Sequence, residues 1–132
     1  MKTISTILLI ITLTLCLASC DPGKVLTIKA DRKSNSSVVL YTNNTILPFS
    51  NKKDSSKLII HVPYNDTTVK TFLYGIGNWP NESIADLSTK IDSIVIMNSL
   101  GKLVLSTKSD IQMYLKKNRS GYAGSVLTIE AR

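Results

Sequence analysis

The chain has 132 residues and a formal net charge of +7, from 16 lysines and arginines against 9 aspartates and glutamates. A chain of this length is expected to form one domain with a core of its own. The sequence has no internal repeat, heptad pattern or long low-complexity tract, which excludes repeat and coiled-coil architectures. The basic residues are scattered, which favours a role in solubility, with attraction to anionic lipid as the alternative.

The N-terminal segment has the anatomy of a secretory signal. Lys2 supplies a positive charge, and apolar residues dominate the stretch 7–15. This apolar run is too short for a membrane-spanning helix, which needs about 20 residues. The next residues, 17–20 (LASC), resemble the lipobox of bacterial lipoprotein signal peptides at every position. An ordinary signal peptide cleaved near Ala18, with Cys20 left as a free thiol, is the alternative.

The lipobox resemblance implies cleavage between Ser19 and Cys20 and attachment of a diacylglycerol and an N-acyl chain, such as palmitate, to Cys20. Two or more acyl chains hold a protein stably at a bilayer. The predicted organisation is a signal peptide at 1–19, a lipidated cysteine with a short spacer at 20–23, and one globular domain at 24–132. Because the spacer is short, the domain is expected to lie close to the membrane.

This interpretation places the chain outside the cytoplasm, anchored to a bacterial membrane and facing the periplasm. Asp21 resembles the signal that retains lipoproteins in the inner membrane of enteric-type bacteria. Other lineages do not follow this rule, so the sequence does not decide between the inner and the outer membrane. Nucleic acid is not an expected partner there. Cys16 leaves with the signal and Cys20 is consumed by lipid, so the mature chain keeps one histidine and no thiol. Neither a zinc site nor any cofactor is predicted.

Alternating apolar and polar residues predict strands over most of the domain, in chain order at 24–30, 38–42, 57–62, 67–74, 92–97, 102–106 and 125–131. Residues 43–56 are predicted to form a polar loop, with Ile46, Leu47 and Phe49 directed inward. Residues 75–80 (GIGNWP) interrupt the strand pattern and indicate a bend. Residues 98–101 (NSLG) are typical of a hairpin connection between the strands that flank them.

Two helices are predicted. The first covers 81–90, where Ile84, Leu87 and Ile91 recur at helical spacing. The second follows Thr107, which with Asp110 has the pattern of an N-cap and capping box. About seven strands with two short helices indicate an α+β fold with a mostly antiparallel sheet. An all-β sandwich, with the helical segments as loops, is the alternative.

The second helix is predicted to bury one face and to carry cations at its end. Ile111, Tyr114 and Leu115 share a face, and Lys116, Lys117 and Arg119 are predicted to fall in the last turn of the helix. Cations suit the C-terminus of a helix because of its dipole, which gives this basic group a structural interpretation. Contact with an acidic lipid, a glycan or another partner is the functional one.

The only histidine, His61, lies in a predicted strand and is interpreted as a surface or boundary residue. An enzymatic role would require it to meet carboxylates such as Asp66 or Asp86 in a pocket. The sequence shows no nucleophile, base and orienting acid in one motif, and the chain is predicted not to be an enzyme.

Aromatic residues give the other candidate contacts. Trp79 is the only tryptophan, and packing in or at the rim of the core is its structural interpretation. Together with Tyr74 and Tyr64 it is otherwise a candidate for stacking on a sugar or a partner. Residues 66–68 (DTT) and 92–94 (DSI) resemble a short motif that is O-glycosylated in some Gram-negative envelopes, and Thr67 is the better candidate because it lies in a predicted turn.

The stretches 35–40 and 59–63 give the mature part a general similarity to small lipoproteins of Gram-negative envelopes. The predicted function is a non-enzymatic, membrane-anchored binding domain of the cell envelope, with an envelope protein or a glycan as partner. A small envelope enzyme or glycan-processing accessory is one alternative, and a lipid-tethered immunity or inhibitor protein is another. The oligomeric state stays open.

Overall fold

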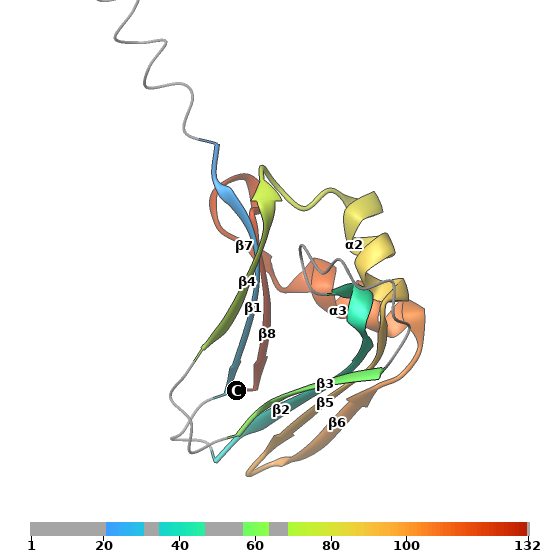
Figure 1. The fold of residues 1–132 in the computed structure, drawn as a ribbon. Helices are drawn as coiled ribbons and strands as arrows, with labels where there is room; N and C mark the ends of the chain where they lie inside the picture. Colours follow the sequence, from blue (N-terminus) through green and yellow to red (C-terminus); the bar gives the residue numbers. More distant parts are fainter. Residues whose placement is uncertain (1–20, 31–34, 47–56, 64–68, 132) are drawn as a thin grey trace, which may run out of the picture.

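The computed structural model describes residues 21–30, 35–46, 57–63 and 69–131. In these residues the chain forms eight strands and two α-helices in two mostly antiparallel sheets, which confirms the predicted α+β class (Figure 1). An all-β sandwich is excluded because both predicted helices form. Cys20, Tyr64, Asp66 and Thr67, on which the lipidation, stacking, catalytic and glycosylation predictions fall, lie outside the described residues.

The first sheet has the strand order β4-β1-β8-β7. Its strands are β1 (Gly23–Ala30), β4 (Lys70–Ile76), β7 (Arg119–Ser120) and β8 (Val126–Ala131). Strand β1 pairs antiparallel with β4 and parallel with β8. The first and last described strands are therefore neighbours. The sequence, which predicted a mostly antiparallel sheet, did not indicate this parallel pair.

The second sheet has the order β3-β2-β5-β6 and is antiparallel throughout. Its strands are β2 (Ser37–Asn43), β3 (Lys57–Val62), β5 (Ile91–Asn98) and β6 (Gly101–Leu105). The predicted hairpin joins β5 to β6, where the side-chain oxygen of Asn98 accepts the N–H groups of Leu100 and Gly101 at 3.0 and 3.1 Å. Gly101 has a φ of 146°, a value that glycine adopts without a steric penalty.

Strand β4 differs from its predicted bounds. It continues through Ile76, which pairs with Gly23, so the predicted break at Gly75 comes two residues later. Gly75 remains in the strand with a φ of 126°, and an added Cβ would meet no atom within 4 Å. Gly75 therefore allows an unusual backbone conformation near the end of β4, and the strand itself ends one residue later.

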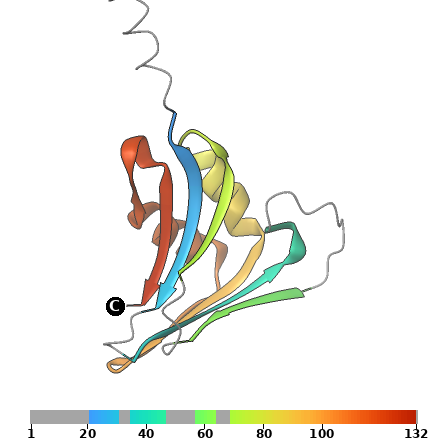
Figure 2. The same ribbon diagram turned by 60° about the vertical axis from the view of Figure 1, so that its left-hand side comes forward.

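The two α-helices are α2 (Asn81–Thr89) and α3 (Lys108–Lys117). Figures 1 and 2 show the sheets set at an angle, with the helices packed where the sheets are farther apart. Helix α3 follows β6 of the second sheet and precedes β7 of the first, and it contacts β5 and β8. It thus crosses from one sheet to the other.

The N-cap of α3 and the buried face of α2 form as the sequence predicts. Thr107 is the N-cap of α3, and its hydroxyl accepts the N–H of Asp110 at 3.1 Å and donates to the Asp110 carboxylate at 2.6 Å. In α2, the Lys90 ammonium lies 2.8 Å from the Asp86 carboxylate. Ile84 and Leu87 are buried, as the helical spacing predicts.

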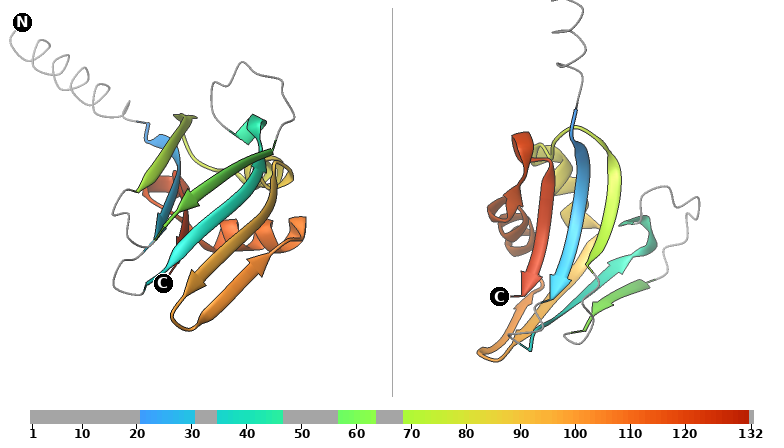
Figure 3. Two further views of the ribbon diagram at one scale, coloured as in Figure 1. Left: turned by 60° about the horizontal axis from the view of Figure 1, so that its bottom comes forward. Right: turned by 90° about the vertical axis from the view of Figure 1, so that its left-hand side faces the viewer.

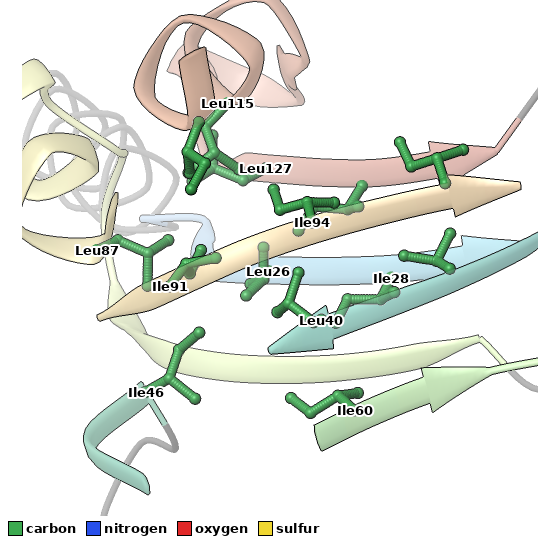
Figure 4. Packing of buried hydrophobic residues seen from close by; sticks show 14 of the residues in the cluster. Leu26, Ile28, Leu40, Ile46, Ile60, Leu87, Ile91, Ile94, Leu115 and Leu127 are labelled. Carbon is green, nitrogen blue, oxygen red and sulfur yellow. The ribbon is translucent and has the colours of Figure 1, made fainter. Parts of the chain in front are cut away.

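The core between the sheets is almost entirely aliphatic. Figure 4 shows Leu26 and Ile28 of β1 facing Leu40 of β2 and Ile94 of β5, with Leu115 of α3 close by. The 3-10 segment η1 (Asn44–Ile46) adds Ile46, which is buried as predicted, whereas Leu47 and Phe49, predicted to point inward with it, lie outside the described residues. In the described part of the chain, every fully buried side-chain nitrogen or oxygen has a hydrogen-bond partner.

Candidate functional site

Trp79 belongs to the core. Only 2% of its surface is exposed, and its indole N–H donates to the carbonyl of Val25 at 2.9 Å. The Tyr74 ring meets it edge-on, with centroids 5.0 Å apart and an interplanar angle of 62°. A buried ring cannot stack on a sugar or a partner, so the structure supports the packing interpretation of Trp79 and contradicts its role as a contact residue.

Polar groups also surround the Tyr74–Trp79 pair and hold it in place. The Tyr74 hydroxyl donates to the carbonyl of Ile46, and burial raises the pKa of this hydroxyl above its ordinary range. The Lys24 ammonium lies 4.5 Å from the centroid of the Trp79 ring and donates to the Ser83 hydroxyl at 3.0 Å. These contacts tie β1, β4 and α2 together, and they describe a structural cluster.

The three predicted basic residues do not form one patch, because Lys116 and Lys117 end α3 whereas Arg119 lies in β7 rather than in the last turn of the helix. Arg119 donates to the carbonyl of Trp79 at 2.9 Å and reaches the side-chain oxygen of Asn81 at 3.5 Å. Its guanidinium therefore fastens the connection that leads into α2. Lys116 and Lys117 are exposed at the end of α3, and of these two Lys117 lines a groove.

His61 is exposed on β3, as its surface interpretation predicts. Its carbonyl accepts a hydrogen bond from the Lys70 ammonium at 2.9 Å. Asp86 lies on α2, where its carboxylate pairs with the Lys90 ammonium. The described residues hold no group of three histidine, cysteine or carboxylate side chains that could bind a metal ion.

A groove lies between β6 and the C-terminal end of α3 and is called the β6–α3 groove below. It consists of two adjoining hollows of about 590 and 410 Å³, which share Lys117, Asn118 and Glu130. The larger hollow is also lined by Ile96, Asn98, Leu100, Gly101, Lys102, Leu103 and Tyr114. The smaller one is also lined by Lys29, Arg119, Ser120 and Thr128.

The larger hollow has an apolar floor. Ile96 of β5 and Leu103 of β6 are register partners, so their side chains lie on the same face of the sheet. Ile96 is only 6% exposed, whereas Leu103 is 47% exposed because it lies on the outer strand. Tyr114 of α3 lies along the opposite wall, and its hydroxyl donates to the carbonyl of Glu130 at 3.2 Å.

The smaller hollow is polar and carries excess positive charge. Lys29 and Glu130 are neighbours on paired strands, with the ammonium 3.3 Å from the carboxylate. Lys117 has no ion pair with any carboxylate among the described residues. An exposed ammonium beside a half-exposed apolar floor suits a ligand that has both an apolar and an anionic group.

Strand β6 also presents an open edge to this region. It is the outermost strand of the second sheet, so one edge has no strand neighbour in the part of the chain that the structure describes. Backbone N–H and C=O groups on such an edge can pair with an added strand. The groove therefore combines three recognition elements: an apolar floor, a cation and a strand edge.

The sequence indicated Lys117 and Arg119 but not Leu103, Tyr114 or Glu130 as groove residues. One signal for Leu103 was present, because residues 103–105 (LVL) place apolar side chains on both faces of a strand. Tyr114 was predicted only as part of the buried helix face. Its position beside Glu130 depends on how α3 crosses to β8, which no local pattern specifies.

Comparison of the chain with protein-family models, with curated proteins and with solved structures gave no match. None of the helices in the described ranges combines the length and the apolar character that crossing a bilayer requires.

Proposed function

We propose that this chain is a lipid-anchored protein of the bacterial cell envelope whose domain binds an extended, acidic segment of another envelope protein. Binding takes place in the β6–α3 groove and involves no catalysis. The anchor follows from the lipobox resemblance of residues 17–20. The observation that carries the binding role is the apolar floor at Leu103 next to the ammonium of Lys117.

An extended segment fits all three elements of the groove. Laid along the open edge of β6, it would add a strand to the sheet, a mode of recognition in which the backbone supplies hydrogen bonds. Alternate side chains would then reach the floor formed by Ile96 and Leu103. An acidic side chain or C-terminus would meet Lys117, which has no described carboxylate partner.

A protein partner is favoured over a glycan by the aromatic content of the groove. Sugar recognition commonly uses an open aromatic face, but Tyr114 is, among the described residues, the only aromatic one that lines the two hollows, and its ring packs against the core. The catalytic alternative is less favoured, because His61 is exposed on β3 and Asp86 is paired with Lys90, while Asp66 lies outside the described residues.

The proposal is tested by photocrosslinking in the bacterium that makes the chain, with a photoreactive amino acid at Leu103. A probe at Ile59 on β3, which is 59% exposed, serves as the surface control. The Leu103 probe is expected to capture a defined envelope protein that the Ile59 probe does not capture. Capture of glycan alone would contradict a protein partner.

Charge reversal makes the test specific to the groove. We expect Lys117→Glu to lower the crosslink yield at Leu103 about fivefold, since an exposed charge contact contributes about 1 kcal/mol. Lys116→Glu is the matched control, because it makes the same charge change on the adjacent exposed residue, which does not line the groove. Equal yields in the two variants would contradict the role of Lys117.

A further inference from the structure

The end of the first sheet at which the domain begins carries an exposed apolar side chain. Gly23 at the start of β1 pairs with Ile76 at the end of β4, and the N–H of Gly77 donates to the carbonyl of Pro22 at 2.7 Å. Ile76 is 76% exposed. Only Asp21 and Pro22 lie between Cys20 and Gly23, the first residue of β1, so Cys20 is at most about 11 Å from the start of β1.

A second exposed apolar side chain lies on the other side of β1. Strand β8 starts beside β1, with Val25 and Val126 in register and the N–H of Val25 donating to the carbonyl of Ser125 at 2.9 Å. The 3-10 segment η2 (Tyr122–Gly124) comes directly before β8, and Tyr122 is 80% exposed. Figures 2 and 3 show η2 and the end of β4 on either side of the start of β1.

The backbone beneath these two side chains is tied together. The N–H of Trp79 donates to the carbonyl of Gly124 at 3.0 Å, which joins the chain after β4 to η2. Gly121 has a φ of 77°, and a Cβ there would lie 2.8 Å from a methyl carbon of Val126. A residue with a Cβ would be strained at this position, so the turn that presents Tyr122 depends on glycine.

Neither tip contains a charged residue of its own. Residues 75–78 are GIGN and residues 121–124 are GYAG, so each tip offers one large side chain among small or uncharged residues. The exposed side chains of Arg119, which packs against Gly124, and of Asp21, which precedes β1, lie beside the tips, at the level of the charged lipid headgroups. Inserting Ile76 or Tyr122 itself removes no charge from solvent, and loss of charge solvation is the main cost of burial in a bilayer. Tyrosine is in addition one of the side chains enriched at membrane interfaces.

We infer that Ile76 and Tyr122 insert into the bilayer interface and dock this end of the domain on the membrane. The inference depends on the proposed lipid anchor at Cys20, which would hold both tips at a high effective concentration near the bilayer. Docking orients the molecule. The β5–β6 turn, which borders the β6–α3 groove, lies at the opposite end of the domain and would face away from the membrane (Figure 1).

The test uses the full, lipidated protein in vesicles of phosphatidylethanolamine and phosphatidylglycerol. Maturation at the lipobox leaves no free thiol, so a single added cysteine can carry a nitroxide label. Asn78→Cys places the label at an exposed polar position beside Ile76, and Leu100→Cys places it on the 93% exposed turn at the opposite end. Accessibility to a water-soluble nickel complex is then measured by electron paramagnetic resonance.

We expect the label at position 78 to be about tenfold less accessible than the label at position 100, since burial of two apolar side chains favours the docked state by at least this factor. Adding Ile76→Asp with Tyr122→Asp should remove the difference while the lipid anchor is unchanged. Both residues are largely exposed, so the fold should be kept, and circular dichroism checks this.

The outcomes separate docking from anchoring. Equal accessibility at positions 78 and 100, in protein that floats with the vesicles, would overturn docking and leave the anchor in place. Protection at position 78 that persists in the double-aspartate variant would also overturn it, because the short spacer alone would then explain the protection. Protein that does not float with the vesicles would overturn the anchor and docking together.

Discussion

Trp79 connects segments that are far apart in the sequence. Its indole N–H donates to Val25, its backbone N–H donates to Gly124, and its carbonyl accepts from Arg119. The sequence singled out Trp79 and Arg119 separately, as an aromatic and a basic candidate. The structure joins them in a structural role, because the Arg119 guanidinium donates to the carbonyl of the buried Trp79.

The alkaline stability of the protein is expected to depend on Tyr74. Burial raises the pKa of its hydroxyl above the ordinary value near 10. Above about pH 10 the unfolded chain releases this proton while the folded chain retains it, so the free energy of unfolding falls as pH rises. This one group contributes a slope of up to about 1.4 kcal/mol per pH unit, measured by urea unfolding at a series of alkaline pH values.

Tyr74→Phe provides the comparison for this pH dependence. The variant loses the hydrogen bond to Ile46 and should be less stable at neutral pH by about 1 kcal/mol. Its stability should also fall less steeply above about pH 10. Tyr122→Phe, at a site that is 80% exposed, is expected to keep the wild-type slope. A Tyr74→Phe slope as steep as that of the wild type would show that Tyr74 does not titrate differently on folding.

Among the elements, those that local contacts define could be predicted from the sequence. The hairpin at residues 98–101, the helix at Asn81–Thr89 and the start of α3 at Thr107 all form as expected. Each is determined by residues close to one another in the sequence. In the hairpin, for example, the side chain of Asn98 accepts hydrogen bonds from two backbone N–H groups of the same turn.

The N-cap of α3 gives a direct test at this scale. Thr107→Ala removes the hydroxyl that accepts the N–H of Asp110 and should lower the free energy of unfolding by about 1 kcal/mol. The change is read as a lower midpoint in urea with an unchanged slope. Ser106→Ala, one residue earlier and also exposed, is the control. Equal midpoints in the two variants would contradict the capping role.

The pairing of distant elements could not be predicted in the same way. Nothing near β1 indicates that it pairs in parallel with β8 at the end of the chain, or that the strands divide into two sheets. The groove residues Leu103 and Glu130 depend on this arrangement, because β6 and β8 belong to different sheets. Alternation identifies which face of a strand is apolar, but the partner strand is chosen by packing across the whole core.

At the scale of the whole molecule, the two proposed surfaces lie at different places. Ile76 and Tyr122 flank the start of β1, next to the short spacer that follows Cys20. The β6–α3 groove is bordered by the β5–β6 turn at the opposite end of the domain (Figure 3). A domain docked at one end would therefore keep its groove open to a partner.

Both proposals require that Cys20 carries lipid, and the most direct test is metabolic labelling with a clickable fatty acid. Each buried methylene contributes about 0.8 kcal/mol, so two or three acyl chains on one residue would make release from the membrane negligible. The account predicts that the wild-type protein is labelled and found in the membrane fraction, and that Cys20→Ser is not labelled. Equal labelling of the two proteins would contradict it.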